Sequence, residues 1–282
     1  YILGNSTNDV DICTEATPKD IKEIFENITL PKTDYGAVRL DIKKHRFDIM
    51  TFRREISYYN NRKPMEVEYI KDLSSDLRRR DFTMNTLCMD KDGNIIDLLN
   101  GREDIENMVI NTVGDSISRF VEDPLRILRA VRFYTTLGFS LSEECKLAII
   151  HTKSELSRLS YQRKKDELDK IFCHTNVKRG IDILVELGLD KELELDFSKC
   201  VYNTDLIGIW DSIGVNGNYP FTKNEKDLIE KIRLVRDMNN LDNVVLYKYG
   251  LYVNIVAGSL NGTDRKDIAN KYDKLPIKTK DD

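Results

Sequence analysis

Long apolar runs, paired cysteines and histidines are scarce in this 282-residue sequence, and each scarcity excludes a class of protein. No apolar stretch approaches the roughly 20 residues that a membrane-spanning helix needs, so no membrane association is expected. The five cysteines are scattered without a Cys-x-x-Cys pair, which argues against a zinc knuckle or a disulfide framework. Reduced thiols in a cytoplasmic protein are the simpler interpretation. None of the three histidines precedes an aspartate, so the sequence has no His-Asp phosphohydrolase motif.

Charges of both signs are abundant but unevenly placed. The net charge of −4 argues against a protein that coats nucleic acid indiscriminately. Residues 119–180 nevertheless contain 13 Lys and Arg against 8 Asp and Glu, a local charge of +5, and the rest of the chain carries −9. A basic segment in an acidic protein fits an anionic partner bound at one place, although a solvated helical surface explains it equally well.

The first 112 residues combine strand and helix signals, which is typical of an α/β domain. Thr17 and Pro18 suit the N-cap and the first position of an amphipathic helix. Asp92-Gly93 suits a hairpin turn. Strands are predicted at Asp9–Cys13, Val38–Ile42 and Phe47–Phe52.

Beyond residue 52 the pattern changes. Residues 53–68 are charged and rich in tyrosine, and we expect a mobile loop there. Ser74 and Ser75 are expected to cap the next helix. From Pro124 onward apolar residues recur at helical spacing, so the second part is predicted to be all-helical. Residues 196–222 have weak periodicity and are expected to form a connection.

Two carboxylates in the first predicted strand carry the first chemical signal. Asp9 and Asp11 are two positions apart, so they point to the same side of a strand. Two carboxylates on one face repel unless a cation lies between them, and Mg²⁺ is commonly held by one or two carboxylates together with substrate phosphates. Because Asp-x-Asp is common, two aspartates that simply face water remain the alternative.

A third carboxylate, Asp48, interrupts the apolar strand Phe47–Phe52 and therefore lies on the sheet face opposite its apolar neighbours. If this strand lies beside that of Asp9 and Asp11, three carboxylates converge. Two would hold metal, and the third can also accept the proton of an attacking hydroxyl. A surface residue on an edge strand is the alternative.

Three consecutive arginines, Arg78 to Arg80, form the first of two arginine-rich motifs. Their side chains splay around a helix axis, so at least one can face a neighbouring anion. Arg80 and Asn85 are the best candidate ligands for a triphosphate and a sugar. An exposed basic turn is the alternative.

The second arginine-rich motif begins at Pro124, which suits the first helical position and makes Asp123 the predicted N-cap. Arg126, Arg129 and Arg132 recur every three residues along one side of the helix. Asp123 offers acceptors and Arg126 donors, so the two can pair with a base edge. A helix cap and a solvated face are the alternatives.

In order and spacing these motifs resemble the bacterial-type (class II) tRNA CCA-adding enzymes, which share them with bacterial poly(A) polymerases. The matching segments are Leu3-Gly4, Asp9–Thr14, Asp48–Arg53, Arg79–Asn85, Asp97 with Gly101 and Asp104, and Glu122–Arg126. Three later segments resemble the C-terminal region of CCA-adding enzymes from Gram-positive bacteria: Asn218–Glu225, Leu246–Leu251 and Leu275–Lys278. The resemblance is dense over residues 1–135 and looser beyond.

The resemblance implies template-independent addition of CMP and AMP, from CTP and ATP, to the 3′ end of tRNA with release of pyrophosphate. Asp9 and Asp11 would bind two Mg²⁺ ions, and Asp48 would be the third catalytic carboxylate. The implied nucleotide contacts are Arg80, then Asp123 and Arg126 at the base, with Arg129 and Arg132 nearby. The implied fold is a polymerase-β-like α/β nucleotidyltransferase head followed by an all-α neck, body and tail. The resemblance implies no protein partner.

We expect three domains: a head over residues 1–112, a nucleotide- and RNA-binding neck over 113–190, and a tRNA-binding body and tail over 191–282. RNA contacts are predicted in the basic segment, at Arg158, Arg163, Lys164 and Lys165. The family's Glu-Arg motif corresponds here to Gln162-Arg163, so only the arginine is carried over. Because the family's Gly-Gly-x-x-Arg-Asp would precede Leu3-Gly4, we expect a head truncated at its N-terminus and an incomplete tail.

Other functions remain open at this point. A bacterial poly(A) polymerase shares the head, but the acidic net charge and the Gram-positive-like tail favour CCA addition. A catalytically impaired RNA-binding protein fits the missing glycines, although Asp9, Asp11 and Asp48 argue against it. A small-molecule nucleotidyltransferase would keep the aspartate pair without needing the Glu122–Arg132 helix.

Overall fold

The computed structural model contains two compact units. It describes residues 2–4, 10–25, 28–29, 36–42, 45–59, 63–202, 205–214 and 217–277, without the side chains of 28–29, 55–59 and 63–66. Unit 1 comprises Tyr1–Asn107 and Asn111–Asp123, and unit 2 comprises Met108–Ile110 and Pro124–Asp282. The first unit thus ends eleven residues later than the head predicted to end at residue 112. The predicted division of the remainder into neck, body and tail stays a prediction.

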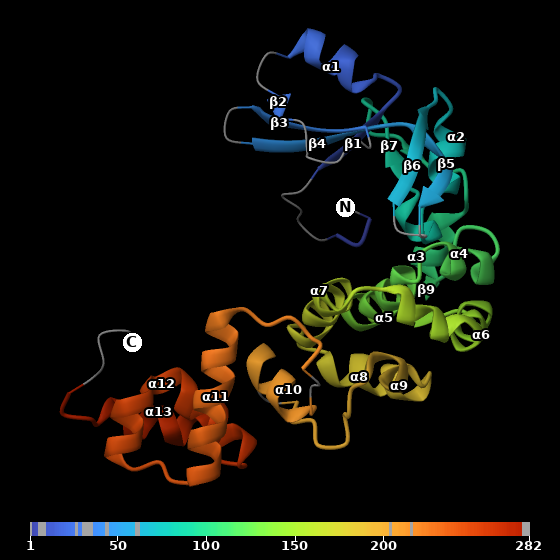
Figure 1. Ribbon diagram of the computed structural model, residues 1–282. Helices are drawn as coiled ribbons and strands as arrows, with labels where there is room; N and C mark the ends of the chain where they lie inside the picture. Colours follow the sequence, from blue (N-terminus) through green and yellow to red (C-terminus); the bar gives the residue numbers. More distant parts are fainter. Residues whose placement is uncertain are drawn as a thin grey trace. The chain divides into compact units, whose positions relative to one another are not determined.

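Unit 1 is built on a four-stranded sheet with the strand order β1-β4-β3-β2 (Figure 1). The strands are β1 (Asp11–Thr14), β2 (Ile28–Thr29), β3 (Ala37–Ile42) and β4 (His45–Thr51). β1 is parallel to β4, and the other neighbours are antiparallel. The predicted strands Val38–Ile42 and Phe47–Phe52 are confirmed, whereas Asp9, at the start of the first predicted strand, lies outside the described residues.

One face of this sheet is covered by α1 (Pro18–Ile24), as Figure 1 shows. Thr17 and Asp20 cap the helix reciprocally, which confirms the predicted start. The buried Ile21 of α1 packs against three strand residues, Val38, Leu40 and Ile49. Each buried aliphatic side chain contributes roughly 1.5–3 kcal/mol. Alternation along the strands therefore places Asp11, Arg39 and Asp48 on the opposite face.

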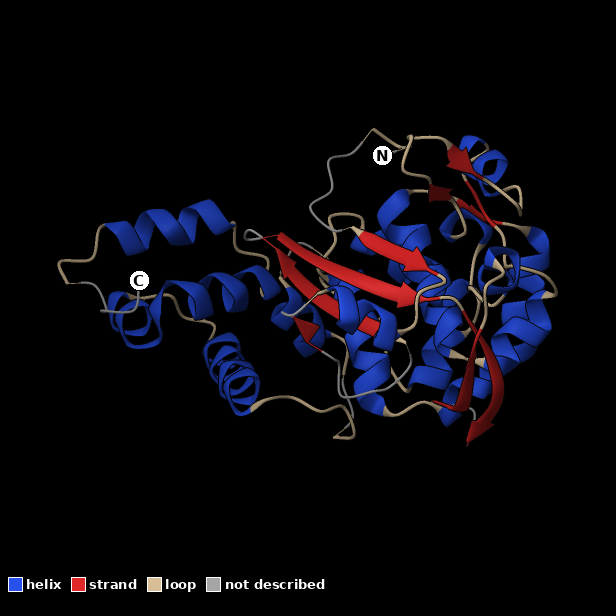
Figure 2. Ribbon diagram, turned by 90° about the horizontal axis from the view of Figure 1, so that it is seen from above, coloured by secondary structure: helices blue, strands red, loops and turns tan. Residues whose placement is uncertain are grey.

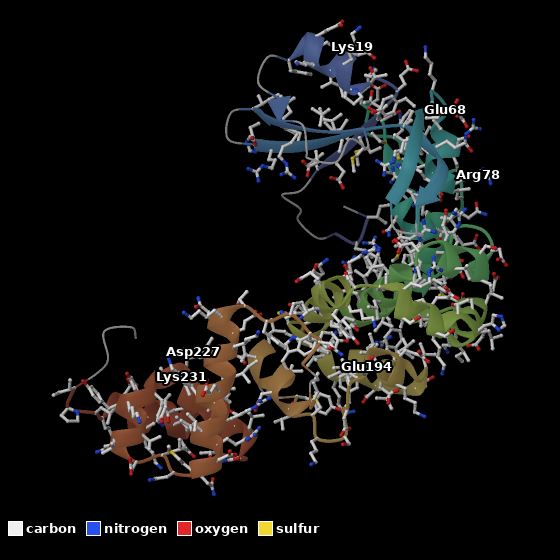
Figure 3. All side chains as sticks on the ribbon, viewed as in Figure 1. Lys19, Glu68, Arg78, Glu194, Asp227 and Lys231 are labelled. Carbon is white, nitrogen blue, oxygen red and sulfur yellow. The ribbon has the colours of Figure 1, made fainter. Side chains whose placement is uncertain are left out.

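The mobile loop predicted over residues 53–68 is wrong. The segment forms an antiparallel hairpin of β5 (Arg53–Tyr59) and β6 (Lys63–Tyr69). Tyrosine, isoleucine and valine favour strands, and Pro64 is tolerated because each strand of a two-stranded ribbon has an open edge. Arg54 and Glu68 face each other across the ribbon and form an ion pair of 2.6 Å (Figure 3 labels Glu68).

Short elements complete unit 1. They are α2 (Leu73–Arg78), the 3₁₀ turn η1 (Thr83–Asn85), β7 (Cys88–Met89), β8 (Ile95–Ile96), α3 (Gly101–Glu106) and α4 (Ser116–Glu122). The predicted cap of α2 is corrected: Asp72 is the N-cap and accepts hydrogen bonds from the amides of Ser74 and Ser75. The hairpin predicted around Asp92-Gly93 is confirmed, since β7 pairs with β8.

Unit 2 is helical apart from the short parallel pair of β9 (Val109–Ile110) and β10 (Ser140–Leu141), as Figures 1 and 2 show. Its helices are α5 (Leu125–Leu137), α6 (Glu143–Thr152), η2 (Lys153–Arg158), α7 (Tyr161–Phe172), α8 (Val177–Glu186), α9 (Leu189–Leu193), α10 (Leu206–Ser212), α11 (Lys223–Met238), α12 (Asn243–Leu260) and α13 (Arg265–Asp273). The predicted fold class, an α/β head followed by helices, is confirmed. No helix in the described part of the chain is long and apolar enough to cross a membrane.

Two details of unit 2 depart from expectation. α10 lies inside residues 196–222, which were predicted to form a connection. The buried side chains of Ile209 and Trp210 hold this helix in place, and it is too short to show an amphipathic repeat in the sequence. α5 has Pro124 as its N-cap, so Asp123 precedes the cap rather than forming it.

α12 is interrupted at Gly250, whose φ of 74° and ψ of 171° are not helical. The amide group of the buried Asn254 donates a hydrogen bond of 2.7 Å to the Gly250 carbonyl.

Candidate functional site

A row of charged residues crosses three strands of the unit 1 sheet. Asp11 of β1 is the register partner of Asp48 of β4, and Asp48 is the partner of Arg39 of β3. Residues paired in this way share a sheet face, and this face is opposite the apolar cluster under α1. The structure therefore brings the predicted carboxylates Asp11 and Asp48 side by side. Asp9, the third member of the predicted set, lies outside the described residues.

Arg39 holds Asp48 through two hydrogen bonds, from Nε to Oδ1 at 2.8 Å and from Nη2 to Oδ2 at 3.1 Å. These bonds lower the pKa of Asp48 below its usual 3.8, so the carboxylate is ionised at neutral pH. The two side chains are 43% and 36% exposed, and an exposed pair contributes little to stability. Arg39 was not predicted from the sequence, although the hairpin that joins the two predicted strands sets it opposite Asp48.

The donor set on this face suits a hard divalent cation. Asp11 and Asp48 offer carboxylate oxygens, which Mg²⁺ prefers, and one or two protein carboxylates are its usual complement beside substrate phosphates. Within the described ranges no third metal-binding side chain joins them. Two adjacent carboxylates on a half-exposed face fit a metal that also binds a substrate.

The predicted triphosphate motif is organised by Asp76, a residue that was not predicted from the sequence. Asp76 is buried and accepts hydrogen bonds from Arg79 at 2.7 Å and from Arg80 at 3.4 Å. Arg80 also donates to the Asn85 carbonyl at 2.9 Å, and the Asn85 amide donates to Asp81 at 2.9 Å. The predicted ligands Arg80 and Asn85 are thus held together. The i,i+3 and i,i+4 spacing of Asp76 from the arginines was the available signal.

A second network fixes this motif against α3. Asp104 accepts hydrogen bonds from the Thr83 hydroxyl and from the Asn111 amide, the latter at 2.6 Å. Asp97 caps α3 by accepting from the backbone amide of Gly101 at 2.9 Å. A Cβ on Gly101 would lie 2.2 Å from the Thr83 carbonyl oxygen, so only glycine fits. The contacts of α3 therefore fix the position of η1 through Asp97, Gly101 and Asp104.

Two thiols meet beside the carboxylates. The Sγ atoms of Cys13 and Cys88 are 3.7 Å apart, and both residues are partly buried. The hydrogen bond with Cys88 is the largest cause that lowers the pKa of the Cys13 thiol to about 6, and the charge of Arg80 adds to it. The same bond and burial raise the pKa of Cys88.

The arginines of α5 have partners within unit 2. Arg132 forms an ion pair of 2.9 Å with Glu167 of α7, whose side chain is 5% exposed. Arg129 and Arg132 lie over the Phe133 ring, at 5.5 and 4.7 Å from its centroid. Arg126 is half-buried on the same helix. Arg132 therefore joins α5 to α7, a role that was not predicted from the sequence.

Asp123, the other predicted base contact, belongs to unit 1. It is the C-cap of α4, with extended backbone, and its amide donates to the Arg119 carbonyl. Its side chain is half-buried.

Two of the predicted RNA contacts lie inside the fold. Lys164 and Lys165 are 3% and 5% exposed, and Lys165 bonds to Asp169 at 2.8 Å and to Glu225 at 2.9 Å. Their burial argues against contact with phosphates. Arg158 and Arg163, in contrast, are half-buried. The helical spacing of α7 could have indicated this burial, because Lys165 lies on the same side of the helix as the buried Leu168.

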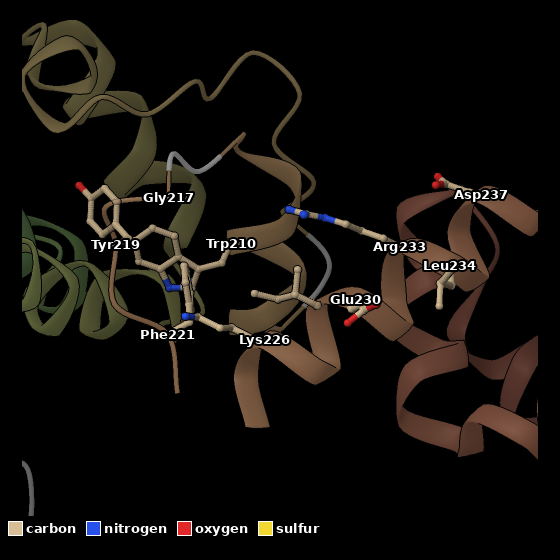
Figure 4. A pocket seen from close by; sticks show the side chains of 10 residues that line it. Trp210, Gly217, Tyr219, Phe221, Lys226, Glu230, Arg233, Leu234 and Asp237 are labelled. Carbon is tan, nitrogen blue, oxygen red and sulfur yellow. The ribbon is translucent and has the colours of Figure 1, made fainter. Parts of the chain in front are cut away.

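A hollow of about 520 Å³ lies in unit 2 and was not foreseen. Figure 4 shows aromatic side chains on one side of it, Trp210, Tyr219 and Phe221, and Arg233 and Asp237 of α11 on the other. Trp210 and Tyr219 are almost fully buried, so the rings serve mainly as the wall of a packed core. Of the motifs singled out from the sequence, the Asn218–Glu225 segment contributes Tyr219 and Phe221 to this wall.

Two family models match the sequence. Residues 1–111 match the poly(A) polymerase head domain, and residues 138–197 match the probable RNA- and SrmB-binding site of polymerase A. The CCA-adding enzyme of Oceanobacillus iheyensis is 36% identical over 194 residues, which cover 69% of this chain and 48% of that enzyme. The chain thus spans about half the length of the curated relatives it matches.

Solved structures agree with this assignment. The CCA-adding enzyme of Bacillus stearothermophilus in complex with CTP has a TM-score of 0.82 and 27% identity, and the match covers 99% of this chain and 77% of that one. The Thermotoga maritima CCA-adding enzyme complexed with tRNA has a TM-score of 0.68 and shares the fold, at 20% identity over 96% of this chain and 74% of that one. The matched head domain carries the pair of Asp11 and Asp48. The chain belongs to the family of CCA-adding enzymes and bacterial poly(A) polymerases.

Proposed function

We propose that this protein transfers nucleotides to an RNA 3′ end, and that the reaction is CCA addition to tRNA. The observation that carries the proposal is the pairing of Asp11 with Asp48 on one face of the head sheet. Aspartates in this arrangement suit a transferase that joins a hydroxyl to the α-phosphate of a nucleoside triphosphate. Curated relatives bearing the name CCA-adding enzyme favour this reaction over poly(A) addition.

The proposed division of labour follows the geometry. Asp11, with Asp9, holds two Mg²⁺ ions, which when bound stabilise the charge on the reacting phosphate and on the attacking and leaving oxygens. Asp48 accepts the proton of the RNA 3′ hydroxyl, for which it must be ionised; its ordinary pKa of 3.8, lowered further by the hydrogen bond with Arg39, meets this condition at neutral pH. Arg80 and Asn85 position the triphosphate and the sugar.

Base choice is proposed to rest on Asp123 and Arg126. The carboxylate of Asp123 accepts from the exocyclic amine that cytosine and adenine both carry, and Arg126 donates to their ring acceptors. Arg129 and Arg132 support the helix that carries Arg126. A relative was solved in complex with CTP, which is consistent with a protein that selects this nucleotide.

The RNA is proposed to be tRNA, bound in the cytoplasm by the basic segment 119–180. Half-buried arginines of this segment, Arg158 and Arg163, are the proposed phosphate contacts, because Lys164 and Lys165 are buried. The Thermotoga relative was solved with tRNA bound.

One assay tests the whole proposal. The full-length protein is incubated with Mg²⁺ and tRNA that ends before the final CCA, with each nucleoside triphosphate alone and with CTP and ATP together. We expect CTP alone to add two residues, and both together to complete CCA and stop. Unlimited addition from ATP alone would indicate a poly(A) polymerase, and no addition under any condition would overturn the proposal.

A further inference from the structure

The thiol pair of unit 1 has no part in the proposed chemistry. Cys13 follows Asp11 by two residues on β1, so alternation places it on the same sheet face as the carboxylate row. Cys88 begins β7, 75 positions along the chain, yet the two Sγ atoms are only 3.7 Å apart. Sulfur atoms at that distance are in van der Waals contact.

This pair is unlike the other cysteines. Cys13 and Cys88 are the cysteines of unit 1, and Cys145, Cys173 and Cys200 all belong to unit 2. Cys145 is fully buried, whereas Cys173 is exposed. Unit 1 therefore holds two thiols in mutual contact, and unit 2 supplies an exposed thiol for comparison.

A small reagent can reach the pair, because both cysteines are only partly buried. Cys88 lines a hollow of about 320 Å³ whose other walls are apolar, among them Leu87, Met84 and Ile95. A disulfide needs an S–S distance of about 2.05 Å, so the sulfurs must approach by roughly 1.7 Å. Rotation about the Cα–Cβ bonds or a small shift of β7, a strand of two residues, can supply this. A bond that requires such adjustment is of the labile, easily reduced kind.

We propose that Cys13 and Cys88 are a modification site at which a reversible disulfide forms. The co-reactant is a small-molecule disulfide of the glutathione class. The thiolate of one cysteine attacks it, which gives a mixed disulfide and releases one small thiol. The other cysteine then attacks the mixed disulfide and releases a second small thiol. Two protein thiols are oxidised, one small disulfide is reduced, and the two protons lost by the cysteines end on the released thiols.

The cross-link changes the site, a consequence that rests on the proposed function. It ties β1, which carries Asp11, to the segment that follows Arg80 and Asn85. A metal ligand and a triphosphate ligand are then fixed in one relative position. Because a misplacement of about 1 Å can cost a hundredfold in rate, we expect the oxidised protein to add nucleotides at least tenfold more slowly.

The linkage is tested independently of activity. The protein is equilibrated with oxidised and reduced glutathione at a series of ratios, quenched with acid, and digested for peptide mass mapping without reduction. We expect a Cys13–Cys88 peptide pair at ratios where the exposed Cys173 carries only mixed disulfide, and its loss in Cys13→Ser and in Cys88→Ser. The Cys173→Ser variant should retain it. Absence of the linked pair while Cys173 is modified would overturn the proposal.

The effect on the site is then measured on portions of the same equilibrated samples that are neither quenched nor digested. Nucleotide incorporation should fall in the oxidised wild type, recover on addition of dithiothreitol, and stay constant in the Cys13→Ser variant, with melting temperatures recorded to verify folding. A linked protein with unchanged incorporation would overturn the control of activity. A reduced protein without activity would instead count against the proposed function and leave the mapped disulfide standing.

Discussion

At the scale of single residues, Asp11 and Asp41 provide a matched pair of tests. Both are exposed carboxylates of the same sheet, but only Asp11 lies beside Asp48; Asp41 pairs with Arg46 at 3.2 Å. We expect Asp11→Ala to lower nucleotide incorporation about a hundredfold or more, because a metal ligand is lost. Its melting temperature should change little, since the side chain is exposed.

Asp41→Ala is the control and should retain wild-type incorporation. Near-normal incorporation by Asp11→Ala, or an equal loss in both variants, would contradict the metal assignment.

Base selection depends on single side chains as well. Asp123→Asn and Arg126→Ala should relax discrimination against UTP and GTP by about one to two decades, because a hydrogen-bonding partner of the base is lost. The measurement is single-nucleotide incorporation with each of the four triphosphates. A merely structural role would instead lower the melting temperature and leave the preference for CTP and ATP as it is.

Much of this residue-level picture was accessible from sequence. Alternation along a strand placed Asp48 on a polar face, and the sheet register then paired it with Asp11. Arg39 and Asp76 were missed because the importance of each depends on a partner that only pairing or burial reveals. Lys165 was misassigned, since a lysine counted as surface charge lies in the core with two carboxylates around it.

At the scale of elements, the contact of α3 with η1 depends on Gly101. Alanine is the better helix former by about 1 kcal/mol, yet its Cβ would lie 2.2 Å from the Thr83 carbonyl oxygen. We expect the clash to outweigh the gain in helix propensity, because that oxygen belongs to the backbone and cannot rotate away. We expect Gly101→Ala to lower the free energy of unfolding by about 1–3 kcal/mol, measured by urea denaturation.

Gly217→Ala is the matched control, because no neighbouring atom lies within 4 Å of the place that a Cβ on Gly217 would take. An equal effect of the two substitutions would show that glycine content, rather than the contact with η1, sets the stability.

The join between α7 and α11 should depend on pH. Lys165 donates a hydrogen bond to Glu225. Burial raises the pKa of Glu225, but the hydrogen bond with Lys165, together with those from Thr222, brings it below the usual 4.5. A lowered folded pKa gives stability that is present above pH 4.5 and lost as the pH falls through the folded value. Glu225→Gln preserves the capping box with Thr222 but weakens the ion pair, so we expect a loss of about 1–3 kcal/mol at pH 7.

The difference in unfolding free energy between wild type and Glu225→Gln should shrink as the pH falls below 4.5, because the wild-type carboxylate protonates first in the unfolded state and then, at its lowered pKa, in the folded state. Thr222→Ala, which removes the hydroxyl cap and keeps the ion pair, should show a smaller convergence, because the hydrogen bond of the Thr222 side chain lowers the pKa of Glu225 less than the hydrogen bond with Lys165 does. A pH-independent difference for Glu225→Gln would contradict the electrostatic account.

Elements were predicted best where a local signal is strong. Thr17-Pro18 determines the start of α1, and Asp92-Gly93 determines the turn between β7 and β8, through the backbone preferences of these residues alone. The β5–β6 ribbon and α10 were missed because polar composition hides a strand that pairs with its neighbour, and because a short helix can be held by one large buried side chain such as Trp210.

At the scale of the whole molecule, tRNA affinity should follow the basic segment. Replacing Arg158 and Arg163 together by glutamine should weaken binding and reduce the slope of log affinity against log salt by about one for each lost phosphate contact. Fluorescence anisotropy at several salt concentrations measures both. Lys231→Gln is the control: this lysine of α11 pairs with Asp227 at 2.8 Å, lies outside the segment and is labelled in Figure 3. An unchanged slope in the double variant would place the RNA elsewhere.

The interruption of α12 at Gly250 has a consequence for the way the C-terminal helices are assembled. Val245, before the break, and Val253, after it, belong to one buried cluster with Ile232 of α11. Leu246, before the break, packs with Ile268 of α13, and Ile255, after it, lies against the same cluster. Both halves of α12 therefore contact both neighbouring helices, so one continuous segment holds α11 and α13 together across the break. Its setting depends on one torsion that only glycine adopts readily, and on the Asn254 amide that secures it.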